Sequence, residues 1–179
     1  MLVFWLFVFA GLWAFFWSFG TSTFQRQEEV QLFIPEWSVV RDMLSVPGGF
    51  CTVCGQALVQ YYASSLFVLC VNSAFLCMAG FLCYLLLQEI APRGYNLLLS
   101  LFPVLGLLKA HTSPFYVLDG TVGLFLLLLF TYVFIRIRRT AVRSLYGVAS
   151  VVLLYGLAGQ LAALYGLVGV FMSLLCRRK

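Results

Sequence analysis

Long, uninterrupted apolar runs are the feature that most limits what this chain can fold into. The runs consist of Leu, Phe, Val and similar residues, without the regularly spaced polar positions of an amphipathic helix or a half-buried strand. Of the 179 residues, 63% are hydrophobic and 9% are charged, whereas a soluble domain carries about 25% charged residues. A globule this poor in charge could not cover its own surface, so we expect a lipid bilayer to be its solvent.

The choice of secondary structure follows from that solvent. In a bilayer the backbone must satisfy its own hydrogen bonds, which leaves helices or a closed barrel. Barrel strands alternate apolar and polar residues over about 10 positions, and these runs do not alternate. Since a spanning helix needs about 20 apolar residues, the sequence predicts an all-α, polytopic integral membrane protein. We expect about five transmembrane helices and an interfacial outer loop, in a single membrane domain over residues 1–179.

The expected helices follow the apolar runs, and one polar region separates the first two. Helices are predicted at about 2–20, 62–87, 95–110, 117–135 and 145–176, and the outer loop at 21–61. The first run has no basic residues before it and no clear cleavage site after it, which favours an uncleaved helix over a signal peptide. Pro103 and Gly106 interrupt the short third run, and the proline is expected to kink it.

Basic residues set the expected orientation and partners. Four arginines stand in the stretch RIRRTAVR, and such residues mark cytoplasmic loops. The N-terminus is then cytoplasmic and residues 21–60 lie outside. The basic residues flank apolar runs, which indicates contact with lipid headgroups and excludes nucleic acid as a partner. The expected partners are the lipid bilayer and other membrane helices or subunits.

The last apolar run leaves three alternatives open. Five simple spans would place the terminal CRRK outside, against the positive-inside tendency. A re-entrant or broken segment around Gly156–Gln160 would return this end to the cytoplasm. A chain cut from a longer protein would also explain the mismatch.

Two stripes of small residues predict helix-packing faces, because small side chains let membrane helices approach closely. One stripe has +3, +4, +3 spacing on the second helix, and the other follows the last helix. We interpret the two cysteines of the first stripe as packing residues. The stripes are Cys70, Ser73, Cys77 and Gly80, and then Gly159, Ala162, Gly166, Gly169 and Ser173.

Cys51 and Cys54 form a CxxC in the outer loop. The pair could be a disulfide or a thiol–disulfide site, or two incidental small residues near a helix start. No second cysteine pair is present to complete tetrahedral zinc. The sequence predicts no metal site and no cofactor.

Four polar positions are of the residue types that can take part in catalysis or binding. Glu28 and Glu29 follow the first helix, where they are either solvated boundary residues or a general base. His111 is interpreted as a polar residue at the outer interface. Asp119 is expected to cap the start of the fourth helix, where an acidic side chain interacts favourably with the positive end of the helix dipole.

Asn72 and Gln160 lie nearer mid-span, where polar groups bond across helices. No charge is evident at mid-membrane depth, which disfavours ion-coupled transport.

The outer loop is expected to hold one or two interfacial helices, with Pro47-Gly48-Gly49 as the turn between them. Trp37, Val40, Met43 and Leu44 are at helical spacing and are expected to face lipid, with Arg41 and Asp42 toward water. The candidate functional surface consists of Pro47, Gly48, Gly49, Gln56, Gln60 and Tyr61.

Short motifs in the outer loops carry a family resemblance. They are QLF at 31–33, PGG at 47–49, ALVQYY at 57–62 and HTSPFY at 111–116. With these the chain resembles a family of uncharacterised polytopic bacterial membrane proteins. It departs from that pattern in CTVC and in Ser-Pro where Asn-Tyr is usual. The resemblance implies a multi-pass protein of the bacterial inner (cytoplasmic) membrane, and an N-terminal fragment, since family members run longer. It supplies no catalytic residues.

The predicted function is therefore that of a membrane component of unknown biochemical activity, structural or assembly-related and not catalytic. The alternative is a relative or fragment of a membrane glycosyltransferase that uses lipid-linked sugars, which would use an acidic residue in the first outer loop. A transporter is the weaker alternative.

Overall fold

Helices make up the regular structure of this chain. The computed structural model describes residues 1–31, 33–62, 64–113 and 115–176, with side chains for all of these except residues 21, 22, 30, 65 and 172–176. Helix accounts for 81% of the structure, and its described residues contain no strand. The predicted all-α class is confirmed.

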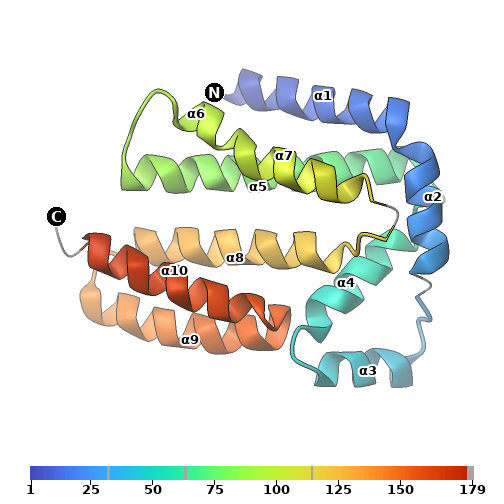
Figure 1. Cartoon of the computed structure of the whole chain (residues 1–179). Coiled ribbons are helices and arrows are strands. Elements are labelled where there is room, and N and C mark those ends of the chain that lie inside the picture. The colour runs from blue at the N-terminus through green and yellow to red at the C-terminus, as the bar shows by residue number, and fades with distance from the viewer. Residues whose placement is uncertain (32, 63, 114, 177–179) are drawn as a thin grey trace.

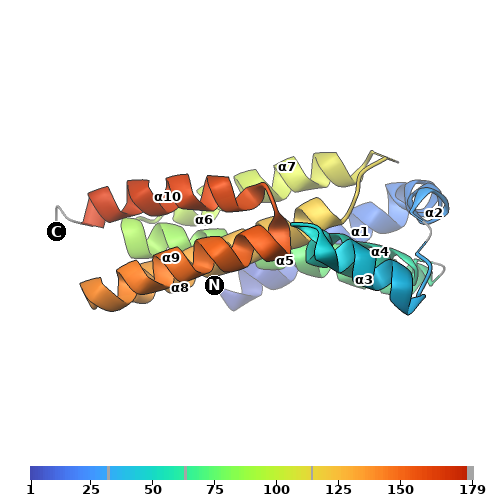
Figure 2. The same cartoon turned by 90° about the horizontal axis from the view of Figure 1, so that it is seen from below.

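The helices form a bundle with a cap across one end. In chain order they are α1 (Leu2–Phe19), α2 (Thr21–Val30), α3 (Trp37–Ser45), α4 (Gly49–Val59), α5 (Ser65–Ile90), α6 (Asn96–Leu99), α7 (Leu101–His111), α8 (Asp119–Arg136), α9 (Thr140–Ala158) and α10 (Leu161–Cys176). Helices α1, α5, α7, α8, α9 and α10 run along a common direction, and α2, α3 and α4 gather at one end (Figure 1). Figure 2 shows the same gathering from a second direction.

The two ends of the bundle differ in what they contain. The cap end holds α2, α3 and α4, the connection after α7 and the turn between α9 and α10 (Figure 1). The opposite end holds the connections 91–95 and 137–139. We call it the arginine end, because the last turn of α8, the two connections and the first turn of α9 carry Arg93, Arg136, Arg138, Arg139 and Arg143.

Four helices are long and apolar enough to cross a membrane: α1, the Leu66–Ile90 part of α5, α8 and α9. The structure thus gives four full-length candidates where about five were expected. The run predicted as one helix at 95–110 forms the short α6 and the 11-residue α7. Pro103 lacks the N–H that would bond Leu99, so the helical ladder is interrupted at that point.

The run predicted as one helix at 145–176 is two helices. The backbone of Gly159 has φ 59° and ψ −120°, outside the helical region, and it separates α9 from α10. Helix α10 therefore runs back toward the arginine end (Figure 1). The break falls inside the segment Gly156–Gln160, where one of the sequence alternatives placed it.

Other helix ends shift by a few residues. The helix predicted at 62–87 is α5, which begins at Ser65 after a turn at Tyr61–Tyr62 and ends at Ile90, before Pro92. The helix predicted at 117–135 is α8. The predicted outer loop contains three helices instead of one or two, and the PGG turn joins α3 to α4. Helix α3 has no buried residue, and its Trp37 is 74% exposed.

Two apolar cores fill the bundle. The larger one joins α1, α2, α4, α5, α7 and α8 around residues such as Leu69 and Leu76, which are fully buried. The smaller one joins α8, α9 and α10 through Leu127, Leu154, Ala162 and Tyr165. Helix α8 belongs to both cores, so it connects the two halves of the molecule.

Candidate functional site

Two glycine turns from distant parts of the chain meet at the cap end. Gly48 in the α3–α4 turn has φ 87°, and Gly159 in the α9–α10 turn has φ 59°. Glycine adopts such values without steric cost. The Gly48 N–H donates to the Gly156 carbonyl at 3.0 Å. A Cβ on Gly48 would lie 3.2 Å from the Gly159 nitrogen, so the two backbones touch. We call Gly48, Gly156 and Gly159 the glycine clasp.

A cavity of about 400 Å³ opens beside the clasp. Its polar groups come from three separate parts of the chain: the thiol of Cys51, the hydroxyl of Thr52, the carboxylate of Asp119 and the amide of Gln160. The full lining is Pro47, Gly48, Cys51, Thr52, Asp119, Gly120, Ala158, Gly159, Gln160 and Leu161. The cavity can accept a small polar ligand or a polar backbone segment.

The two cysteines of the CxxC stand on α4 and are both free thiols. Burial, with the nearby Cys54 and Asp119, raises the pKa of the Cys51 thiol to about 11. Burial also raises the pKa of Cys54. Thiol–disulfide exchange requires the thiolate, and at neutral pH both groups are held protonated. The arrangement therefore favours the interpretation of Cys51 and Cys54 as small residues that pack on α4 over their interpretation as a reactive thiol pair.

A buried polar network lies on the other side of the cap end, where α2 meets the connection after α7. The side-chain amide of Gln27 donates to the Ser113 carbonyl at 2.9 Å and to the His111 carbonyl at 3.4 Å. One turn later on α2, the amide of Gln31 donates to the Tyr116 carbonyl at 2.8 Å. The two glutamines thus tie α2 to this connection by satisfying its carbonyl groups.

His111 is the centre of this network. Its Nε2 lies 2.9 Å from the Thr121 hydroxyl, and the Tyr116 hydroxyl lies 2.7 Å from the same Thr121 oxygen. The imidazole also packs against the rings of Phe16 and Tyr116. Burial lowers the pKa of His111 to about 4, and burial raises the pKa of the Tyr116 phenol. The ring is therefore neutral at physiological pH.

His111 was predicted to be a polar residue at the outer interface; within the protein it is 1% exposed. Its position at the end of α7 brings it under α1 and α2, which the sequence could not show. Among the described residues, no group of three or more His, Cys, Asp or Glu side chains could hold a metal ion.

A second buried pair stands at the start of α5. The Tyr62 hydroxyl and the Asn72 side-chain amide are within 3.1 Å, and Asn72 also donates to the Val68 carbonyl. Burial raises the pKa of Tyr62. Asn72 was expected to bond across helices, but its partners are Tyr62, in the turn before α5, and Val68 on α5 itself. Gln160 was expected near mid-span, but it lies exposed in the α9–α10 turn, because Gly159 ends the helix there.

The predicted candidate surface is divided in the structure. Pro47 and Gly48 line the cavity. Gly49 is buried at the start of α4, in the α3–α4 turn. Gln56 is half-buried, whereas Gln60 and Tyr61 are exposed.

The predicted packing stripes are also divided. On α5, Ser73 and Gly80 are buried, Cys77 is half-buried, and Cys70 lies exposed. A Cβ on Gly80 would lie 2.5 Å from Val104 and 2.7 Å from the Trp5 ring, so this glycine allows close packing between helices.

In the second stripe, Gly159 in the α9–α10 turn and Ala162 on α10 are buried. A Cβ on Gly166 or Gly169 would meet nothing within 4 Å, so these two glycines face open space. The side chain of Ser173 lies outside the described residues.

The acidic residues considered for catalysis stand apart from the cavity. Glu28 is half-buried and Glu29 exposed on α2, and neither lines it. Asp119 begins α8 and accepts a hydrogen bond from the Gly120 N–H, in keeping with its predicted role at that helix terminus.

Sequence reasoning missed Gln27, Gln31, Tyr116 and Thr121. A signal existed for the glutamines, since Gln27 and Gln31 are four residues apart on one face of a helix.

Comparisons with known proteins give one family and nothing further. No curated protein and no solved structure matches the chain. A sequence model described as "Family of unknown function (DUF6057)" matches residues 1–179, so the match covers the whole chain. The chain therefore belongs to the family of unknown function DUF6057.

Proposed function

We propose that this protein is a non-catalytic component of a membrane, structural or assembly-related, and that it acts through its cap end and its helix faces. Helices α1, α5, α8 and α9 would cross the bilayer, with α6–α7 and α10 as further, shorter segments. The location is proposed to be the bacterial inner membrane. The expected partners are the lipid bilayer and other membrane helices or subunits.

The distribution of charge supports an orientation with the arginine end in the cytoplasm. The arginine end carries five arginines and one acidic residue, Glu89, which pairs with Arg136 at 3.0 Å. The other five acidic residues belong to the cap end, together with Arg26, Arg41 and Lys109. Basic residues concentrate in cytoplasmic loops. Because α10 returns toward the arginine end, this orientation also agrees with the positive-inside tendency after the last helix.

The proposal rests on the observation that the buried polar groups of the cap end are bonded within the protein. Gln27 and Gln31 satisfy backbone carbonyls, and His111 is bonded to Thr121 inside the protein. Buried polar groups bonded in this way fix one arrangement of the chain. These bonds hold α2, α7, its following connection and α8 together at the cap end, which supports a rigid binding surface.

Helix α3 supports contact between this end and lipid headgroups. Trp37 and Leu44 are exposed, and they share a helix face with Val40 and Met43. The charged Arg41 and Asp42 of the same helix are exposed as well. An amphipathic helix of this kind lies in the plane of the membrane interface. The glycine clasp fixes the end of α3 to the turn between α9 and α10.

The test separates this role from that of a glycosyltransferase relative. A strain of the source organism that lacks the gene is complemented with Glu28→Gln/Glu29→Gln, with Gly48→Val or with the wild-type gene, and fitness is measured in competition with the parent. We expect the carboxylate variant to complement fully. Gly48→Val should fail, because valine is strained at φ 87° and collides with Gly159. Membrane levels and thermal stability of the carboxylate variant provide the control.

Loss of complementation by Glu28→Gln/Glu29→Gln at normal membrane level and stability would overturn the non-catalytic role and favour the enzyme. Uptake or leak of solutes through vesicles containing the purified wild-type protein would instead favour a transporter.

A further inference from the structure

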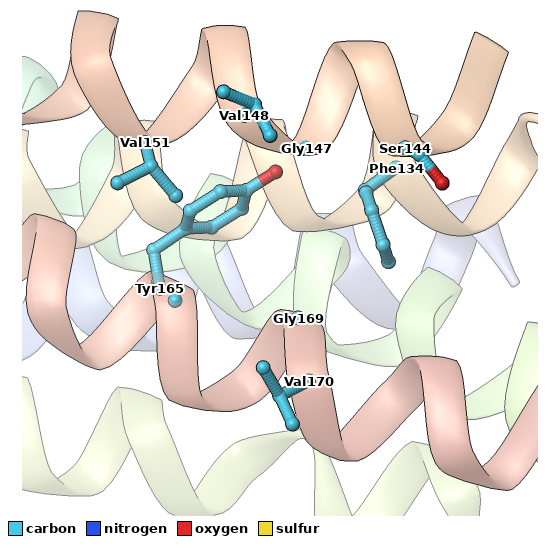
Figure 3. Close-up of a pocket in the computed structure, with 9 residues that line it drawn as sticks. Phe134, Ser144, Gly147, Val148, Val151, Tyr165, Gly169 and Val170 are labelled. Carbon is cyan, nitrogen blue, oxygen red and sulfur yellow. The ribbon is translucent and has the colours of Figure 1, made fainter. Parts of the chain in front are cut away.

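An apolar groove of about 310 Å³ runs between α9 and α10, with Phe134 of α8 in its lining (Figure 3). Its lining is Phe134, Ser144, Gly147, Val148, Val151, Tyr165, Gly166, Gly169 and Val170. The groove is open along α10 because two of these residues are glycines, where a Cβ would meet nothing within 4 Å. In Figure 3 the ring of Tyr165 and the side chains of Val148 and Val151 lie along its walls.

The walls of the groove are fixed and carry few polar atoms. The Tyr165 hydroxyl lies 2.6 Å from the Ser150 hydroxyl, so its polar atom is already bonded inside the protein. The Tyr165 ring meets Phe130 of α8 edge to face. The space is therefore preformed and suited to a hydrocarbon chain.

One end of the groove opens at the arginine end. Phe134 lies two residues before Arg136, and Ser144 directly follows Arg143. The Arg143 guanidinium lies 5.9 Å from the centre of the Phe134 ring, at the mouth of the groove. Arg138 and Arg139 are exposed in the short connection between α8 and α9. Since Arg136 pairs with Glu89, the remaining arginines at this mouth face no other acidic residue of the chain.

The first turn of α9 adds to this positive charge. It contains no acidic residue, and no side chain caps its N–H groups. The positive end of a helix favours phosphate, and an arginine fork matches phosphate oxygens in geometry. A hydrocarbon groove therefore opens directly beneath a site suited to a phosphate group.

We propose that this groove binds one anionic phospholipid, with an acyl chain along Gly147, Gly166 and Gly169 and the phosphate held by Arg139 and Arg143. The charge at the mouth argues for an anionic headgroup, and the apolar lining argues for a hydrocarbon tail. A helix from another protein is about 10–12 Å across with its side chains, which is broad for a groove of 310 Å³.

The test measures lipid binding by the purified full chain in detergent. Native mass spectrometry counts bound lipid as phosphatidylglycerol is added, with the zwitterionic phosphatidylcholine as the comparison. We expect one phosphatidylglycerol to bind at least tenfold more tightly than phosphatidylcholine. Arg139→Gln/Arg143→Gln should remove this preference. Gly169→Leu fills the groove and should weaken binding of both lipids at least tenfold.

Matched variants control for charge and for side-chain volume. Arg26→Gln/Arg93→Gln removes the same charge away from the groove. Gly11→Leu makes the same substitution on α1, where a Cβ also meets nothing within 4 Å. Both controls should bind like the wild type.

Several results would overturn the proposal. Unchanged binding by Gly169→Leu would mean that the arginines hold headgroups without the groove. Equal binding of the two lipids would mean that the groove does not select an anionic headgroup. A dimer that Gly169→Leu dissociates, with lipid binding unchanged, would make a second copy of the chain the occupant.

Discussion

Glycines on α5 and α10, in the two halves of this bundle, have opposite surroundings. In the half built from α1, α5 and α7, Gly80 lets the Trp5 ring and Val104 approach the backbone of α5. In the half built from α8, α9 and α10, Gly166 and Gly169 face open space. The same small residue therefore closes one helix interface and leaves a groove along another. A stripe of small residues by itself does not distinguish these outcomes.

Among the described residues, more buried polar groups lie in the first half than in the second. The first half, with the cap, holds buried His111, Asn72 and Gln27, each bonded to another element or to its own connection. In the second half, Ser150 and Tyr165 form a buried cross-helix bond. We infer that the first half is a rigid scaffold and that the second half offers a surface to a ligand.

Overpacking should expose the largest difference between the halves. Gly80→Leu would force side-chain atoms into Trp5 and Val104, which should destabilise the protein by about 3 kcal/mol. Gly169→Leu is the matched change, and it should alter stability by less than about 1 kcal/mol. Thermal unfolding of the two variants in detergent measures both effects. Equal losses would mean that the halves are packed alike.

Acid should weaken the scaffold half through His111. The pKa of this residue is lowered in the folded protein to about 4, below its ordinary 6.5. The unfolded chain then takes up the proton first, so stability is full above pH 6.5 and falls as the pH drops toward 4. The slope should approach about 1.4 kcal/mol per pH unit, or about 2 kcal/mol between pH 6.5 and 5.

His111→Gln provides the control, because His111 is the only histidine in the chain. Thermal unfolding midpoints between pH 7 and 5 should fall for the wild type and stay nearly level for the variant. A parallel fall in both proteins would assign the pH dependence to other groups.

Removing one hydroxyl from each half should give the smallest contrast. Tyr62→Phe leaves the side-chain oxygen of the fully buried Asn72 without its partner, which should cost about 1–2 kcal/mol. Tyr165→Phe should cost about 0.5 kcal/mol, since the Ser150 hydroxyl keeps its bond to the Gly147 carbonyl. Chemical denaturation of the two variants compares them. A larger loss for Tyr165→Phe would reverse the assignment of scaffold and surface.

The sequence was sufficient for the features that depend on local composition. Apolar runs predicted the helical class and the long helices α1, α5 and α8, and PGG predicted the turn between α3 and α4. The break at Gly159 was only one of three alternatives, because a single glycine in an apolar run is compatible with a continuous helix.

The features that the sequence did not predict arise from contacts between distant segments. His111 was placed at an interface because its neighbours in the sequence are polar, but α1 and α2 cover it. The network of Gln27, Gln31, Tyr116 and Thr121 requires α2 to lie beside the connection after α7. Likewise, only the geometry of α9 and α10 shows that Gly166 and Gly169 line a groove.

The glycine clasp has a consequence for the order in which the protein is made. Gly48 leaves the ribosome while the segment that contains Gly156 and Gly159 has still to be translated. Until α9 and α10 have been made and have packed against the bundle, the Gly48 N–H lacks its acceptor and the α3–α4 turn has no backbone to rest on. The cap therefore reaches its final form late in biogenesis, and a partner that recognises this form would join only after the last two helices are in place.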